Sequence, residues 1–375
     1  MKILIAGDYY PLSRVDKLVE SKEYVKVFNS IKSVITDNDY SIVNLEAPVV
    51  ISNCKPILKI GPNLKCLDNA VEAIKYAGFN MTTLANNHFY DYGQQGVVDT
   101  FNTLERFGID RVGAGLTLSD AEKVVIKEIK AEKLAIINIC ESEFSIATSN
   151  RGGSNPIDIP KIHNQIKYCR DKVDYILVII HGGHETYQYP SPRMKSLYRL
   201  LIDFGADAIV GHHQHCFSGW EIYNNKLIFY GLGNFSFDKN NSKISNWNKG
   251  YMVSLNFSKD VIKHTIHPYI QGFEQPGVVL LTDDEFKSEI DDINNVIADD
   301  DLLLEKFNEF TEMRRRSVMS AFIPFSNKYI NALYKRKLFP SFISKRKKLI
   351  VHNIIRCESH RDVTLNLLDN DSNSY

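Results

Sequence analysis

Short, almost uninterrupted runs of apolar residues recur along the first 257 residues and predict β-strands. The runs lack the alternation of polar and apolar positions that marks a strand with one face in water, so we expect strands buried on both faces of a sheet. The predicted strands cover residues 2–6, 40–45, 81–84, 134–139, 175–180, 208–210, 227–230 and 250–257.

Stretches in which apolar residues follow a helical spacing lie between these strands. The spacing predicts helices over 64–76, 96–107 and 191–204. A glycine follows each of them closely (Gly78, Gly108 and Gly205), and glycine commonly ends a helix because it accepts a left-handed backbone conformation. The regular alternation of strand and helix predicts an α/β domain with helices on both faces of its sheets.

Polar residues with carboxylate, carboxamide or imidazole side chains follow the predicted strands directly. Ligands in α/β sheets bind beyond the carboxyl ends of the strands, so we expect these side chains to meet in one site. They are Asp8, Asn44, Glu46, Asn87, His88, Asp91, His181, His184, Glu185, His212, His213, His215 and Asn234.

The types of these side chains favour a metal site. Oxygen and imidazole ligands without thiolate suit Mn, Fe, Zn or Mg rather than a structural cysteine-based zinc site. There are enough of them for two divalent ions, the arrangement of two-metal hydrolases. Two histidines in the order His-x-His, His213 and His215, would place both rings on one side if the backbone there is strand-like.

The charge is balanced overall but not along the chain. The sequence has 45 basic and 45 acidic residues, so wholesale binding to nucleic acid is not expected. Residues 283–312 contain twelve acidic and two basic residues, whereas residues 314–357 contain twelve basic and no acidic ones. Three interpretations of the basic segment stay open: pairing with the acidic segment, contact with an anionic membrane surface, or binding of an anionic polymer.

Composition and termini narrow the class of protein further. The chain of 375 residues is 44% hydrophobic and 24% charged, a globular balance. Its six cysteines form no CxxC pair, which suits a reducing compartment. The apolar run at the N-terminus is too short for a signal peptide, and no segment approaches the roughly 20 apolar residues that span a bilayer. We therefore expect a cytoplasmic protein, peripheral at the inner face of the membrane if the basic segment binds it.

An ordered set of motifs resembles the CapA-type poly-γ-glutamate capsule synthesis family, within the metallophosphoesterase-like superfamily. The motifs are GD, NLEAP, LANNHFYDYG, GAG, HGGHE, GHHQH and GLGNFSFD, spread over residues 3–238. The resemblance implies a four-layer metallophosphatase-like sandwich, in which two mixed β-sheets are flanked by helices. We expect this domain over residues 1–275, a helical appendage over 276–365 and a disordered tail over 366–375.

The resemblance also implies roles for individual residues. Asp8, Glu46, Asn87, His181, His213 and His215 look like metal ligands, with Glu46 of the bridging type. Glu185 resembles a further ligand or a residue that orients one. His88 looks like the general acid or substrate contact and Asp91 the residue that orients it, whereas Asn44, His184, His212 and Asn234 are assigned to substrate binding. This chain has Gly182 where the family usually has an aromatic residue.

The function that follows is a metal-dependent, phosphoesterase-like hydrolase in the biosynthesis of a capsular or surface polysaccharide or polyglutamate. Its partner would be an anionic polymer or a precursor of it. Two alternatives use the same metals: a non-hydrolytic component of a polymer synthesis or export assembly, and a hydrolase of γ-glutamyl amides.

Overall fold

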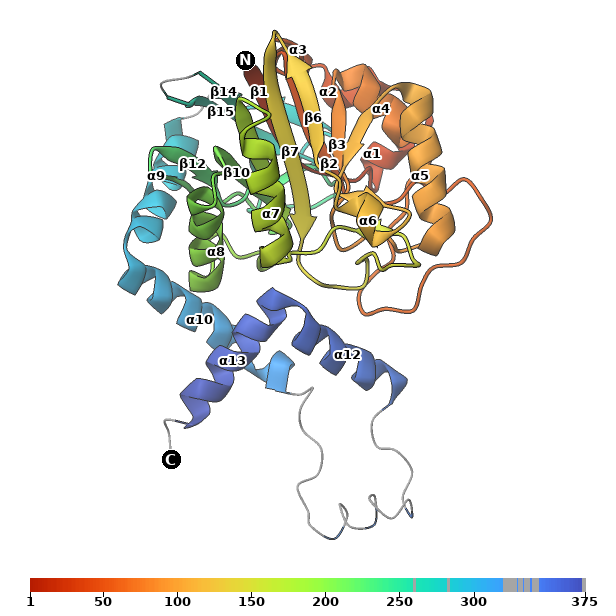
Figure 1. The fold of residues 1–375 in the computed structure, drawn as a ribbon. Helices are drawn as coiled ribbons and strands as arrows, with labels where there is room; N and C mark the ends of the chain where they lie inside the picture. The colour runs from red at the N-terminus through yellow and green to blue at the C-terminus, as the bar shows by residue number, and fades with distance from the viewer. Residues whose placement is uncertain are drawn as a thin grey trace.

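Two β-sheets packed face to face form the centre of the molecule (Figure 1). This computed structural model describes residues 1–258, 261–281, 284–319 and 344–372, together with Tyr329, Leu333 and Leu338. Both sheets contain parallel and antiparallel neighbours, as predicted. The predicted two-sheet α/β architecture is confirmed.

The first sheet has the strand order β16-β15-β14-β1-β2-β3-β4, and β13 also pairs with β1. Its strands are β1 (Lys2–Tyr9), β2 (Tyr40–Leu45), β3 (Met81–Thr83), β4 (Asp110–Val112), β13 (Asn234–Ser236), β14 (Lys249–Asn256), β15 (Lys263–Gln271) and β16 (Val278–Leu280).

The second sheet has the order β11-β12-β10-β9-β7-β6. Its strands are β6 (Val125–Ile129), β7 (Glu132–Cys140), β9 (Tyr175–His181), β10 (Ala208–His212), β11 (Trp220–Tyr223) and β12 (Lys226–Phe229). A separate pair is formed by β5 (Ala114–Gly115) and β8 (Gly153–Ser154).

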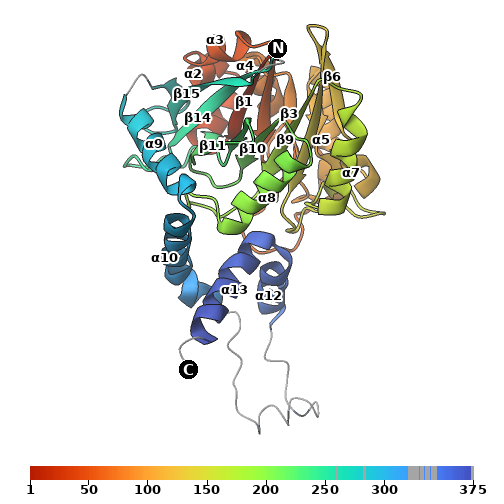
Figure 2. The same cartoon turned by 60° about the vertical axis from the view of Figure 1, so that its left-hand side comes forward.

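Helices cover the outer face of each sheet and complete four layers (Figures 1 and 2). The helices on the first sheet are α1 (Arg14–Glu20), α2 (Tyr24–Phe28), α3 (Lys32–Thr36), α4 (Asn69–Ala77) and α5 (Gly93–Phe107), and their apolar side chains form one core cluster with those of β1 and β2. The helices α7 (Ile159–Arg170) and α8 (Pro192–Asp203) pack on the second sheet. A short helix, α6 (Leu118–Ala121), follows β5.

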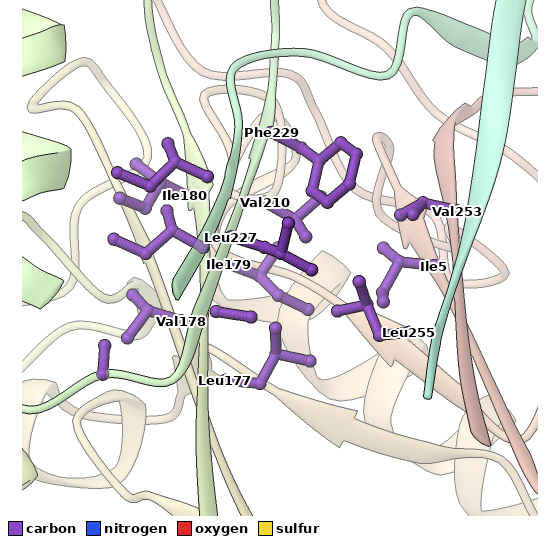
Figure 3. Packing of buried hydrophobic residues seen from close by; sticks show 14 of the residues in the cluster. Ile5, Leu177, Val178, Ile179, Ile180, Val210, Leu227, Phe229, Val253 and Leu255 are labelled. Carbon is purple, nitrogen blue, oxygen red and sulfur yellow. The ribbon is translucent and has the colours of Figure 1, made fainter. Parts of the chain in front are cut away.

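The space between the sheets is filled by apolar side chains of both. Figure 3 shows Ile5, Val253 and Leu255 of the first sheet opposite Ile179 and Phe229 of the second. These side chains are buried, and burial of each stabilises the fold by about 1.5–3 kcal/mol. This core holds the two sheets at a fixed distance, so the loops at their carboxyl ends meet in one place.

Four helices form the C-terminal part of the described chain: α9 (Asp284–Ala298), α10 (Asp300–Met319), α12 (Lys345–Arg356) and α13 (Glu358–Ser372). Helix α13 continues to residue 372 and buries Leu367, within the tail that was predicted to be disordered over 366–375. The first domain also extends past the predicted boundary at 275, since β16 pairs with β15. Among the described residues, no helix has both the length and the apolar composition to cross a membrane.

Charged residues of the two segments form ion pairs within the chain. Arg315 of the basic segment contacts Glu312 of the acidic one at 2.7 Å, whereas Asp300 of the acidic segment contacts Lys195 of α8 at 2.6 Å. The basic cluster at 335–337 lies outside the described residues, whereas Lys345 and Arg346 are exposed at the start of α12. Contact of this segment with a membrane or a polymer stays a prediction.

Helix α13 is docked onto the domain by charged groups and aromatic packing. Arg193 of α8 binds Asp362 of α13 and Glu141 at the end of β7, each at 2.5 Å. Burial would raise the pKa of Glu141, but the adjacent Arg193 outweighs it and holds that pKa low. Beside this network, Phe310 of α10 stacks on Tyr187 with ring centroids 4.4 Å apart. The charged network and the stacked rings both fix α10 and α13 against the carboxyl ends of the strands.

Replacement of Arg193 by leucine is expected to loosen α13. Removing one partner of a largely buried ion-pair network leaves the other charges uncompensated. We expect the backbone amides of α13 to exchange with solvent at least about 10-fold faster by hydrogen–deuterium exchange. Arg199→Leu is the matched control, because Arg199 lies on the same helix at similar exposure but pairs with Glu221 inside the domain. Equal protection of α13 in the two variants would contradict the docking role.

Candidate metal centre

The carboxyl ends of strands from both sheets converge on one buried cluster. In the first sheet, Asp8 of β1 lies level with Asn44 of β2 and Asn234 of β13. In the second sheet, His181 ends β9 level with His212 of β10. Parallel strands end at the same edge of a sheet, so the two edges bring these side chains together.

One group of potential ligands consists of Glu46, His181 and His213, whose donor atoms all lie within 4.8 Å of one another. His181 Nε2 lies 3.0 Å from His213 Nδ1 and 3.1 Å from Asn87 Oδ1. Neighbouring ligands of an octahedral ion at about 2.1 Å lie roughly 3 Å apart, so these separations suit one shared cation. Burial and the neighbouring His213 lower the pKa of His181, which keeps its imidazole neutral and able to bind a metal.

A second group consists of Asp8, Glu46 and His215, again within 4.8 Å. His215 Nε2 lies 3.5 Å from Glu46 Oε1, and His215 Nδ1 lies 3.8 Å from Asp8 Oδ2. The two groups share Glu46, the residue that the resemblance assigns to the bridging role.

The environment of Glu46 fits a cation. Its carboxylate is fully buried, and among the residues that the structure describes neither Oε1 nor Oε2 has a hydrogen-bond partner. Burial and the charge of Asp8 raise the pKa of Glu46 well above its ordinary value. A buried carboxylate without partners costs several kcal/mol, and divalent ions between the histidines and Asp8 would offset this cost.

Two asparagines predicted to bind substrate lie behind the ligands instead. Asn44 donates to Asp8 Oδ1 at 2.7 Å and lies 3.4 Å from His181 Nδ1. Asn234 Oδ1 accepts from His215 Nδ1 at 2.9 Å, which leaves Nε2 of that ring facing Glu46. Both asparagines are buried, and these hydrogen bonds favour a role in positioning the candidate ligands, whereas their contact with substrate stays a prediction.

Replacement of Asn44 by alanine is expected to weaken metal binding by about 10–100-fold, because Asp8 and His181 lose the group that orients them. Titration of metal-free protein with Mn²⁺ measures the change. Asn80→Ala is the control: Asn80 Oδ1 also accepts a hydrogen bond in this sheet, from the amide of Ser41, but lies outside the cluster. Equal affinities of the two variants for Mn²⁺ would contradict the assignment.

The paired histidines do not have the strand-like backbone that was predicted. β10 ends at His212, and His213 and His215 have φ angles of 94° and 56°. Such angles are uncommon for residues other than glycine and cost free energy that the surrounding structure must supply. The rings reach the two ligand groups because of this left-handed backbone and not because of strand alternation.

His88 and Asp91 form a pair beside the ligands. His88 Nδ1 lies 2.7 Å from Asp91 Oδ2, so the ring donates this proton to the carboxylate and leaves Nε2 for proton transfer. Burial lowers the pKa of His88, although Asp91 opposes this shift. The neighbour of His88 in sequence, Asn87, lies with Oδ1 3.1 Å from Nε2 of His181 in the first ligand group, which places the pair next to the candidate metal centre.

Sequence reasoning missed Lys59, which joins this pair from the loop between β2 and α4. Its side chain is almost fully buried, forms an ion pair with Asp91 and lies 3.1 Å from His88 Nδ1. The loop has no regular spacing that would mark a buried lysine. The lysine holds the Asp91 carboxylate in place beside His88.

The remaining predicted residues lie around the cluster. His212 is buried with Nδ1 3.2 Å from Asp8 Oδ1, and its contact with substrate stays a prediction. His184 packs against Phe307 and Phe310 of α10, and burial lowers its pKa to about 3. Within the described part of the chain neither ligand group includes Glu185, which lines a cavity beside His213.

Known proteins are similar to this chain over part of its length. The family model described as "Bacterial capsule synthesis protein PGA_cap" matches residues 2–239. The "Capsule biosynthesis protein CapA" of Bacillus anthracis is 32% identical over 64% of this chain and 60% of its own length. The "PGA biosynthesis protein CapA" of Bacillus subtilis (strain 168) is 32% identical over 62% of each chain. This chain therefore spans about three fifths of the length of these curated relatives.

Solved structures resemble the chain only distantly. A hypothetical protein from Thermus thermophilus aligns with a TM-score of 0.46 and 14% identity, covering 74% of this chain and all of that one. A 5'-nucleotidase from Candida albicans SC5314 gives a TM-score of 0.40 and 11% identity, covering 71% of this chain and 50% of that one. Both TM-scores lie below 0.5, so the fold assignment rests on the two sheets of this chain itself. The family model covers more than half of the chain, and the chain therefore belongs to the bacterial capsule synthesis protein PGA_cap family.

Proposed function

We propose that this protein is a metal-dependent hydrolase of the phosphoesterase type that acts in the synthesis of an anionic capsular or surface polymer. The observation that carries the proposal is the shared Glu46, a buried carboxylate without hydrogen-bond partners among the described residues, which lies between two groups of ligands. The names of the two relatives that are 32% identical refer to capsule and PGA biosynthesis, which supports the polymer context.

Two divalent ions fit the residues present. Glu46, His181, His213 and Asn87 would hold one ion, and Asp8, Glu46 and His215 would hold the other. Carboxylate, amide and imidazole ligands suit Mn, Fe, Zn or Mg. When bound, such ions lower the pKa of a coordinated water and neutralise charge on a phosphoryl oxygen.

The chain itself supplies the proton and the positioning. His88 would act as the doubly protonated imidazolium: Nδ1 donates to Asp91, which opposes the lowering of the His88 pKa by burial, and Nε2 gives its proton to the leaving group. Lys59 forms a buried ion pair with Asp91 and so helps to hold the carboxylate that orients the ring. Asn44 and Asn234 hold their ligands in place.

Hydrolysis by metal-reconstituted protein tests the proposal. We expect full-length protein, stripped of metal by a chelator, to cleave bis(p-nitrophenyl) phosphate only after Mn²⁺, Fe²⁺, Zn²⁺ or Mg²⁺ is added, and Asp8→Asn to remove this activity. Asp99→Asn is the matched control, because Asp99 is a buried carboxylate whose oxygens are bound by Ser52 and Gln95, outside the cluster. No turnover with any metal, although the metal is bound, would contradict hydrolysis and favour a non-hydrolytic role in an assembly. Cleavage of a γ-glutamyl amide in place of the phosphodiester would indicate the amide hydrolase.

A further inference from the structure

A cavity of about 280 Å³ lies between the metal centre and the C-terminal helices. Glu185 and His213 line it from the domain, and Arg314 of α10, Asn353 of α12 and His360 of α13 line it from the other side. Figure 1 shows α12 and α13 at the end of the molecule toward which β7 points. The match to the family model ends at residue 239, so the residues of this second wall lie outside the family domain.

We propose that α10, α12 and α13 complete the substrate site, and that Arg314 and His360 bind an acidic group of the substrate, a carboxylate or a phosphate, opposite the metal ligands. The proposal rests on the function proposed above and extends it to substrate recognition. It assigns a role to a region that the family motifs do not reach.

The contacts of Arg314 leave its charge available for a ligand. Its guanidinium donates to the carbonyl of Glu185 at 3.3 Å and contacts Thr186 Oγ1 at 3.5 Å, and it lies 5.2 Å from the ring centroid of Phe310. These partners orient the side chain at the cavity wall but carry no negative charge. The next residue, Arg315, instead pairs with the carboxylate of Glu312. A planar guanidinium held in this way suits two-point binding of a carboxylate or phosphate.

His360 is oriented by Asn353 on the neighbouring helix. Asn353 Nδ2 lies 3.0 Å from His360 Nδ1, so the ring nitrogen accepts this hydrogen bond and Nε2 carries the proton. Asn353 Nδ2 also lies 3.4 Å from Glu143 Oε2, which ties the arrangement to the domain. His360 therefore offers a hydrogen-bond donor on the same wall as Arg314.

The wall is fixed in place before any ligand binds. Glu141 accepts a hydrogen bond from Ser359 of α13, and Arg193 links Glu141 to Asp362 on the same helix. Gly182 leaves room for this network, since a Cβ atom there would lie 2.7 Å from the side chain of Glu141. A larger side chain at this position would collide with Glu141, which holds α13 to the domain.

The size of the cavity indicates the length of the ligand. Sites for small molecules usually measure about 300–1,000 Å³, so this cavity is at the small end of the range. Apolar side chains of Phe310, Val318 and Ile354 line the same space. Such a cavity suits a short acidic segment, such as the end of a polymer or a precursor, better than the middle of a long strand.

Binding of acidic probes to metal-loaded, full-length protein tests the proposal. The probes are tri-γ-glutamate, which carries carboxylates and no phosphate, and O-phosphoethanolamine, which carries a phosphate and no carboxylate, and calorimetry measures their Kd. We expect Arg314→Gln to raise the Kd of at least one probe about 10-fold or more and Arg314→Lys to raise it less. The probe that is affected identifies the acidic group. Arg315→Gln, the matched control, should leave both Kd values unchanged, and metal content should be equal in all variants.

The proposal is overturned if Arg314→Gln binds both probes as wild type does, or if Arg315→Gln weakens them equally. Failure of the proposed function has a different signature. Wild type would then bind the probes through Arg314 but would not hydrolyse bis(p-nitrophenyl) phosphate with any metal.

Discussion

Glu46→Gln is expected to lower metal-dependent hydrolysis by about 10³-fold, because the two ligand groups share this carboxylate. Losing it would remove several kcal/mol of transition-state stabilisation, at about 1.4 kcal/mol for each tenfold in rate. Turnover of bis(p-nitrophenyl) phosphate at saturating Mn²⁺ measures the change, and elemental analysis of the variant shows whether metal is lost with it.

The same substitution is expected to stabilise the metal-free protein. The pKa of Glu46 is raised, so this group contributes stability below its unfolded pKa and loses it as pH rises through the folded pKa. At pH 8 a neutral glutamine avoids the cost of a buried, unpartnered charge, and we expect the Tm of the metal-free variant to exceed that of wild type by roughly 2 °C. Asp99→Asn is expected to lower Tm, because the oxygens of Asp99 accept hydrogen bonds from Ser52 and Gln95. Full activity of Glu46→Gln, or a fall in its metal-free Tm like that of Asp99→Asn, would contradict the role given to Glu46.

His88→Ala is expected to lower kcat by about 10²–10⁴-fold for a phosphodiester with a poor, alkoxide-type leaving group. The loss should be much smaller for bis(p-nitrophenyl) phosphate, because p-nitrophenolate leaves without a proton. The geometry behind this expectation is the 2.7 Å contact of His88 Nδ1 with Asp91, which leaves Nε2 for the substrate. Rates for a series of leaving groups of rising pKa measure the effect.

A control separates proton donation from a general loss of structure. His163 lies on α7 and packs on Phe204, away from the metal centre, so His163→Ala should keep the wild-type dependence on the leaving group. If His88→Ala lowers kcat by the same factor for every leaving group, His88 binds substrate and does not act as the general acid.

The central strands and the site they position follow from the sequence. Apolar runs without alternation predicted β1, β2, β9 and β10 because these strands are buried on both faces. Glycines marked the ends of α4 and α5, where Gly78 and Gly108 adopt the left-handed conformation. The strand ends then brought the predicted ligands together, since parallel strands finish at one edge.

The rest depends on contacts that no local pattern encodes. The edge strand β6 and the short β4 were missed, because partly exposed or three-residue strands lack a long apolar run. The sequence does not distinguish an asparagine that contacts substrate from one that orients a metal ligand. Only the hydrogen bonds of Asn44 with Asp8 and of Asn234 with His215 favour the second role. Helix α13 extends into a polar tail that composition marked as disordered, because Leu367 is buried against α10 and the 187–189 loop.

The C-terminal helices show the limit of motif reasoning most clearly. Composition divided this region into an acidic and a basic segment and suggested pairing, a membrane or a polymer as partners. Arg314, the first residue of that basic segment, lies at the cavity beside the metal centre. It lies on α10, which packs against α13, and α13 is held to the domain by Arg193 and Asp362, 169 residues apart in the sequence.

Anomalous diffraction from crystals of the full-length protein grown with Mn²⁺ tests the central claim most directly. We predict two peaks roughly 3.5–4 Å apart, on either side of the Glu46 carboxylate, one beside His181 and His213 and the other beside Asp8 and His215. A map in which these residues bind no manganese, or in which the ions lie elsewhere on the protein, would contradict it.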